Sequence, residues 1–332
     1  MESQEVQNFF KAWGIVLASL IYCYLIASKI PKGLFRFLSL LPIISLYTIL
    51  PLSLSRPLSS VLLSGFITWL ANFKLILYCF NRGPLSEPEP QKSLIRFVLF
   101  AALPIKIKDK NAQFHRVLPL NLWSKTLLFA LLDWVHLHTK SLLVFCCMLY
   151  LFIDVAFGAC DRVVGATLGL ELDPPSDEPY LSTSLQDFWG KRWNRMMSDA
   201  LRRTIYMPVK STASNLGGKR WAHVAAVLAA FIVSGLMHEL TYYYVIRVKP
   251  TWEVTWFFVL HGVCVVLEMM VKRALGPKWR LHWAISGPLT VGFVILTGYW
   301  LFFPQVLRND VDIRATEDVM AIGKFFKEMI RG

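Results

Sequence analysis

Apolar runs long enough to cross a lipid bilayer recur along most of this 332-residue chain. A helix needs about 20 apolar residues to cross the hydrocarbon core, because it rises only about 1.5 Å per residue. Runs of about this length lie at 9–28, 34–53, 60–80, 123–139, 141–160, 223–246, 254–272 and 282–304. A further run, 93–105, is too short to cross and is expected to be re-entrant or interfacial. The pattern predicts an all-α, polytopic transmembrane bundle of about eight spans, with 1–332 forming a single membrane-embedded domain.

The amino-acid composition excludes most soluble proteins. Hydrophobic residues make up 55% of the chain and charged residues only 17%, which is too little polar surface for a water-facing protein. The net charge of +13 suggests nucleic-acid binding, but the basic residues lie in the gaps between apolar runs. The positive-inside rule explains that distribution, so we expect no nucleic-acid partner. If 93–105 does not cross, every basic gap falls on one side, and both termini are expected on the opposite, lumenal side.

The longest polar gap, 161–222, is expected to hold an interfacial helix. The stretch 172–179 contains three prolines and cannot be regular helix. Ser184 is then suited to cap a helix that follows it. One face of this helix would be apolar and rich in tryptophan, opposite a basic face, which is typical of helices lying in the membrane interface. The apolar positions are Leu185, Phe188, Trp189, Trp193, Met196 and Met197.

His238 is the leading candidate for chemistry, because it lies deep in the apolar run 223–246. Ionisable groups in a membrane are costly, so each marks either a function or a structural hydrogen bond to a neighbouring helix. Ser234 lies one helical turn before His238 and Tyr242 one turn after it. Glu239 follows directly, and on a helix its side chain points about 100° away. Histidine suits a general base, since its pKa lies near neutrality.

The spacing of the histidines argues against metal chemistry. An H-E-x-x-H zinc motif beginning at His238 would need a second histidine at position 242, which is Tyr242. His136 and His138 lie two residues apart and therefore on different faces of a helix. The chain also has no G-x-S-x-G nucleophile motif. We therefore expect no metal ligands, and the role that remains for His238 is a base acting on a hydroxyl inside the bilayer.

Asn194 is the second candidate. Its position alone favours an ordinary polar residue on the wet face of an interfacial helix. The alternative is a carboxamide that hydrogen-bonds to a reacting carbonyl group. The basic residues within 191–220 would form a patch facing lipid headgroups, and they would equally suit the phosphates of coenzyme A.

Several segments resemble the membrane-bound O-acyltransferase superfamily, and most closely its plant wax-synthase-like branch. The resemblance rests on the motifs D-F-W-G-K-R-W-N at 187–194 and S-G-L-M-H-E at 234–239. The segment N-F-K-L at 72–75 supports it. The resemblance covers about 60–305, with the signature region within about 160–305. Members of the branch often have M-H-D where this chain has Glu239, so a carboxylate is kept at that position.

The resemblance implies an enzyme that transfers an acyl group from acyl-coenzyme A to a long-chain fatty alcohol, giving a wax ester, or to a sterol. It implies that His238 is the catalytic base and that Asn194 is its companion in the site. Acyl-coenzyme A would be a co-substrate, no cofactor would be required, and the endoplasmic reticulum would be the expected location. The residues expected to help bind substrate are Asp187, Trp189, Arg192, Trp193, Arg195, Ser234, Glu239 and Tyr242.

Two alternatives stay open at this point. An enzyme of the same branch could use acetyl-coenzyme A and acylate diacylglycerol or a terpenoid alcohol. A non-enzymatic lipid transporter or scramblase would also be polytopic with buried polar residues, but it would release no free thiol from acyl-coenzyme A.

Overall fold

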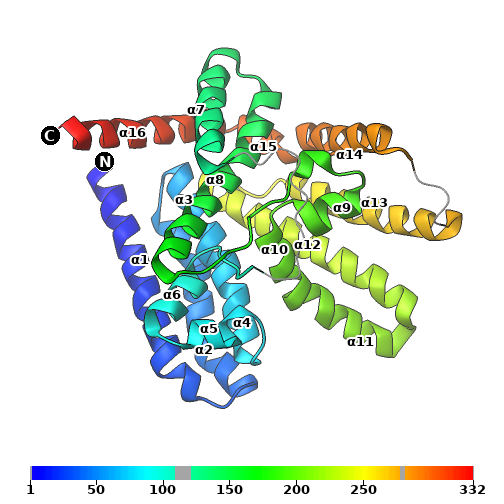
Figure 1. The fold of residues 1–332 in the computed structure, drawn as a ribbon, viewed down its shortest axis with the longest axis horizontal. Coiled ribbons are helices and arrows are strands. Elements are labelled where there is room, and N and C mark those ends of the chain that lie inside the picture. Colours follow the sequence, from blue (N-terminus) through cyan, green and yellow to red (C-terminus); the bar gives the residue numbers. More distant parts are fainter. Residues whose placement is uncertain (1, 109–120, 277–280, 332) are drawn as a thin grey trace.

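The protein is a bundle of helices (Figure 1). The computed structural model describes residues 2–108, 121–276 and 281–331. Within these ranges the only β-structure is an isolated bridge between Ile107 and Leu172. The predicted all-α polytopic fold is therefore confirmed.

Seven helices in the described ranges are long and apolar enough to cross a membrane, judged by length and composition. Their bounds are Gln4–Lys29, Leu34–Ser53, Pro57–Cys79, Leu142–Leu168, Trp221–Ile246, Glu253–Leu275 and Trp283–Phe302. They match seven of the predicted runs. The remaining run, 123–139, does form a helix, α7 (Leu122–Thr139), but it is not one of the seven. Its charged and imidazole side chains lower its mean hydropathy.

Two polar side chains of α7 are paired with other helices of the protein. This helix packs along α8 (Leu142–Leu168), to which a short turn joins it. Lys125 of α7 forms an ion pair with Asp154 of α8. His136, near the other end of α7, hydrogen-bonds to Asp312 at 3.2 Å. Because these partners offset the cost of burying charge, α7 can accompany α8 without being a continuous apolar span.

The first half of the bundle surrounds one heavily buried helix. This helix is continuous from α3 (Pro57–Leu63) through the π-helical turns of η3 (Ser64–Ala71) to α4 (Asn72–Cys79). Among the seven candidate spans it has the largest share of its residues buried. Helix α2 (Leu34–Ile49) packs against both α4 and η3, while α1 (Glu2–Leu25) packs against α6.

Helix α6 (Leu94–Ala102) is the short run that was expected not to cross. Its nine residues rise only about 14 Å, half of a bilayer core. Ser93 caps its N-terminus by accepting a hydrogen bond from Arg96 N at 3.3 Å. At the other end the Nζ of Lys74 donates to the carbonyls of Phe100 at 2.7 Å and Leu103 at 2.6 Å. A buried lysine side chain thus satisfies the terminal carbonyls of α6 and fixes it against α4.

Both chain termini gather at one end of the bundle, as Figure 1 shows. Glu5 accepts hydrogen bonds from the backbone N–H groups of Ser55 and Arg56. Arg56 also pairs with Asp318 of the C-terminal helix α16 (Val311–Arg331) at 3.1 Å. Arg247 reaches the same turn, donating to the carbonyls of Pro51 and Leu54. These contacts bring the two ends of the chain and the connections at 54–56 and 247 together at one end of the bundle.

Helices α12 (Lys219–Ile246) and α13 (Glu253–Leu275) form the closest pair in the second half. Gly235 and Gly262 permit this approach. A Cβ atom on Gly235 would lie 3.0 Å from Thr255 Cα, and one on Gly262 would lie 2.9 Å from Phe231 Cβ. After α13 come α14 (Trp283–Thr297), the π-helical η8 (Gly298–Phe302) and α15 (Pro304–Leu307).

The prediction of one continuous interfacial helix after Ser184 is wrong. Ser184 does cap the start, accepting from Asp187 N at 3.1 Å. The chain leaves helical geometry at Trp193 and Asn194, because Arg195 N donates to the carbonyl of Pro175 in the preceding loop at 2.8 Å. The segment therefore divides into α9 (Leu185–Asp187), η6 (Phe188–Arg192), α10 (Arg195–Leu201), η7 (Arg202–Tyr206) and α11 (Met207–Gly217).

Lys74→Ala should destabilise the protein by about 1–3 kcal/mol, because two carbonyls at the end of α6 would lose their buried donor. Thermal unfolding of the purified protein in detergent measures this. Lys92→Ala is the control, since the Lys92 side chain is 59% exposed and its removal should change stability little. Equal unfolding temperatures for both variants would contradict the anchoring role of Lys74.

Candidate active site

The imidazole of His238 is held in one tautomer. Its Nδ1 lies 2.8 Å from the carbonyl oxygen of Ser234, one turn earlier on α12. A carbonyl can only accept, so Nδ1 carries the proton and Nε2 of the neutral ring keeps its lone pair. Among the described residues, Nε2 has no hydrogen-bond partner. The predicted neighbour Ser234 thus contributes its backbone oxygen to the site and fixes which nitrogen can accept a proton.

Aromatic side chains from three other elements surround the His238 ring. Phe258 of α13 stacks on it at 4.3 Å between ring centroids, with 29° between the ring planes. Trp69 of η3 meets it edge-on at 4.8 Å, and Phe302 of η8 at 5.7 Å. These three residues, which we call the aromatic box, were not predicted from the sequence, since they lie far from His238 along the chain. They surround the imidazole with aromatic rings on three sides.

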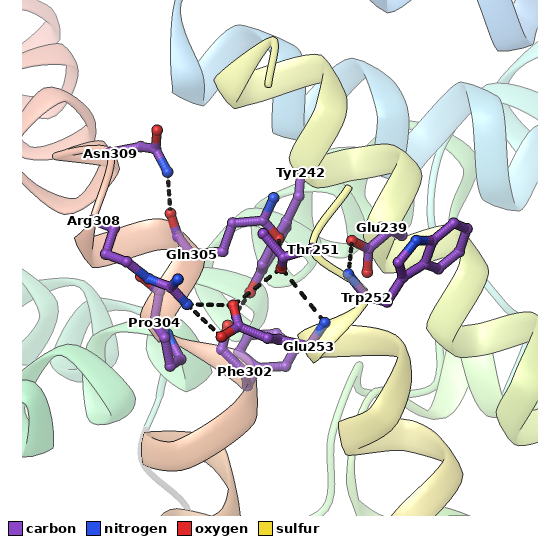
Figure 2. Close-up of polar contacts among 10 residues, drawn as sticks. All are labelled: Glu239, Tyr242, Thr251, Trp252, Glu253, Phe302, Pro304, Gln305, Arg308 and Asn309. Atoms are coloured by element: carbon purple, nitrogen blue, oxygen red, sulfur yellow. Dashed lines mark hydrogen bonds and ion pairs between the residues drawn. The ribbon is translucent and has the colours of Figure 1, made fainter. Parts of the chain in front are cut away.

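Glu239 and Tyr242 lie beside His238 on α12, but their polar atoms contact other elements (Figure 2). The carboxylate of Glu239 accepts hydrogen bonds from Trp252 N at 2.9 Å and from the hydroxyl of Thr255 at 3.2 Å. The hydroxyl of Tyr242 donates to the carbonyl of Phe302 at 2.7 Å. As expected from helical geometry, Glu239 points away from His238 and toward the start of α13.

A second buried histidine fixes Trp189. The indole Nε1 of Trp189 donates to His261 Nδ1 at 2.9 Å, and His261 Nε2 bonds to the hydroxyl of Thr297 at 2.8 Å. His261 is fully buried, and both its nitrogens are satisfied. The ring of Trp189 lies 5.7 Å from that of Phe258, the residue stacked on His238. The structure thus brings the predicted residue Trp189 to the outer wall of the aromatic box.

Asn194 lies at the break between η6 and α10, with a left-handed backbone (φ 34°, ψ 67°) that asparagine tolerates better than most residues. Its Oδ1 accepts from Met197 N at 3.2 Å and so caps α10. Its Nδ2 donates to no other described residue. No hydrogen bond joins Asn194 to His238 within the described ranges; their helices α10 and α12 share η3, which carries Trp69, as a packing neighbour.

The other predicted residues of this segment organise the loop before it. The Arg192 guanidinium donates to Asp187 at 2.9 Å and to the carbonyl of Asp177 at 3.0 Å. Arg195 forms an ion pair with the buried carboxylate of Asp173 at 3.5 Å. The ring of Trp193 stacks on Phe188, with 5.5 Å between the ring centroids. In the loop itself, burial raises the pKa of Tyr180 to about 12, so this phenol stays protonated at physiological pH.

The arrangement is suited to proton transfer rather than to metal binding. A neutral imidazole with one free nitrogen can take a proton from a hydroxyl group brought against it. Among the residues that the structure describes, no three His, Cys, Asp or Glu side chains are grouped so as to hold a metal ion.

The fold and this site define a membrane-embedded transferase. The chain belongs to the membrane-bound O-acyltransferase family, whose sequence model matches residues 172–260, and to its wax-synthase-like branch. It is an O-acyltransferase.

The chain is 41% identical to the long-chain-alcohol O-fatty-acyltransferase of Simmondsia chinensis, over 99% of this chain and 98% of that protein. It is 43% identical to the probable long-chain-alcohol O-fatty-acyltransferase 8 of Arabidopsis thaliana, over 96% of each chain. It is 36% identical to the acyl-CoA–sterol O-acyltransferase 1 of Arabidopsis thaliana, over 98% and 97%.

Trp189→Phe should cost about 1–3 kcal/mol of stability, because His261 Nδ1 would lose its buried donor while ring packing is largely kept. Thermal unfolding in detergent measures the change. Trp193→Phe serves as the control, since a phenylalanine can keep the stacking on Phe188 and His261 is untouched. The hydrogen bond would be unimportant if the two variants unfolded at the same temperature.

Proposed function

We propose that this protein transfers a fatty acyl group from acyl-coenzyme A to the hydroxyl of a long-chain alcohol, with His238 as general base. The observation that carries the proposal is the bond from Nδ1 to Ser234 O, which leaves Nε2 free inside the aromatic box. A base of this kind is poised for a neutral hydroxyl, because an uncharged imidazole and an uncharged alcohol share an apolar site at little cost.

The transfer is direct, without an acyl-enzyme. The alcohol oxygen attacks the thioester carbonyl while His238 Nε2 takes the hydroxyl proton. The new C–O bond forms, the C–S bond breaks, and the imidazolium returns the proton to the leaving thiolate, which departs as coenzyme A. Asn194 Nδ2 donates to the carbonyl oxygen as negative charge develops there.

The names of the relatives support the choice of substrates. Two are long-chain-alcohol O-fatty-acyltransferases, and the third is an acyl-CoA–sterol O-acyltransferase, which makes a sterol the second candidate acceptor. The basic connections on one side of the bundle suit the phosphates of coenzyme A on the cytosolic face. We place the enzyme in the endoplasmic reticulum, where both lipid substrates would meet it within the bilayer.

His238→Ala should lower ester formation by about 100- to 10,000-fold, the usual contribution of a general base. Purified protein given acyl-coenzyme A with a fatty alcohol or a sterol measures both ester and free thiol. His261→Ala is the matched control at another buried histidine. It should lower the unfolding temperature and leave turnover per folded molecule largely unchanged. Full activity in His238→Ala, or transfer of lipid without thiol release, would exclude the proposed chemistry and favour a transporter.

Asn194→Asp and Asn194→Ala separate the two roles of this residue. Aspartate keeps the oxygen that caps α10 and tolerates the left-handed backbone, but it removes the amide donor. Both variants should lower kcat by about 100- to 1,000-fold, whereas only alanine should also lower stability. Normal turnover in a stable Asn194→Asp variant would reduce Asn194 to a helix cap.

A further inference from the structure

Glu239 holds the first turn of α13 in place. Its side chain is 3% exposed, and its two oxygens accept from Trp252 N and from the Thr255 hydroxyl. Trp252, the N-cap residue of α13, has a φ of 65°, a conformation that costs energy for a tryptophan and needs support from its surroundings. The two hydrogen bonds that Glu239 accepts from this turn supply that support.

The same turn of α13 carries the stacked wall of the aromatic box. Thr255 is the residue against which Gly235 of α12 packs without room for a Cβ atom. Phe258 follows three residues later, on the same side of α13, and stacks on His238. The position of Phe258 relative to the imidazole therefore depends on how α13 begins, which Glu239 controls.

Tyr242 fixes a second wall of the box in the same way. Its hydroxyl donates to the carbonyl of Phe302 at 2.7 Å, and the two rings also meet edge-on at 5.8 Å. Phe302 lies in the π-helical turn η8. This bond holds Phe302 against the edge of His238.

An outer set of bonds closes the arrangement (Figure 2). The hydroxyl of Thr251 donates to Gln305 at 3.1 Å, and Arg308 pairs with Glu253. The connection between α12 and α13 is thereby attached to α15, which directly follows η8. Both walls of the box are thus held from the end of the bundle opposite the basic connections.

We propose that Glu239 and Tyr242 are positioning residues that set Phe258 and Phe302 against His238, and that neither binds substrate nor exchanges protons with the imidazole. This inference rests on the proposed role of His238 as base. It assigns Glu239 a role through hydrogen-bond geometry rather than through charge: its oxygens are engaged by α13 and point away from the ring.

The test compares Glu239→Gln, Glu239→Ala and Tyr242→Phe in the purified full-length protein, with acyl-coenzyme A and a fatty alcohol as substrates. Glutamine keeps the length and the oxygen that accepts from Trp252 N, so kcat should stay within about 3-fold of the wild type, with the same pH profile. Alanine removes both bonds, and kcat should fall about 10- to 100-fold with KM for acyl-coenzyme A unchanged. Tyr242→Phe should lower kcat about 10-fold with the same unchanged KM.

Glu5→Ala is the matched control. Glu5 is also a carboxylate from one helix that accepts N–H groups at the start of another, α3, but it is remote from the aromatic box. Its loss should lower the unfolding temperature and leave kcat per folded molecule unchanged.

The possible negative results of this test lead to different conclusions. If Glu239→Gln loses as much kcat as Glu239→Ala and its pH profile shifts, Glu239 acts on His238 by its charge and the positioning role is wrong. Unchanged kcat in both Glu239→Ala and Tyr242→Phe also overturns the proposal. These results leave the base intact as long as His238→Ala is inactive, whereas an active His238→Ala removes the proposed function itself.

Discussion

The close contact between α12 and α13 is the constraint on which the site depends. At Gly235 the two backbones approach until a single methyl group would collide with Thr255. In a bilayer, where lipid tails are as apolar as the helix surfaces, such close packing is a main source of helix association. The contact places Phe258 over His238 and Thr255 within reach of Glu239. A looser pairing would separate the imidazole from the wall that shields it.

Several polar groups inside the bundle have a protein partner that substitutes for water. Lys74 satisfies the end of α6, His261 joins Trp189 to Thr297, and Asp154 pairs with Lys125. At His238 only one of the two ring nitrogens is satisfied within the described residues. An incompletely satisfied imidazole is costly in an apolar site. That cost is consistent with a nitrogen kept available for the hydroxyl of a substrate.

Much of the fold follows from hydropathy alone, and the errors have local causes. Seven of the eight predicted spans match candidate spans of the structure, and the run predicted to be too short to cross forms α6. The run 123–139 was counted as a span, although its polar residues are paired with α8 and α16. The helix after Ser184 was expected to be continuous, but the loop carbonyl of Pro175 captures Arg195 N and breaks it. Neither the contacts of α7 nor the hydrogen bond to Pro175 can be read from one segment of sequence, because each depends on a second segment of the chain.

The sequence by itself determined the membrane class and predicted His238 and Asn194 as candidate site residues, because hydropathy and motif spacing are properties of neighbouring residues. Only the tertiary structure decided what surrounds the imidazole. Trp69, Phe258 and Phe302 belong to three different elements, and the first and last of them are more than a hundred positions apart along the chain. Only the packing of the helices brings the three rings together. The tertiary structure also decided that Glu239 bonds to α13 rather than to His238. Helical geometry fixes the direction of the Glu239 side chain, but only the packing of a second helix supplies its hydrogen-bond donors.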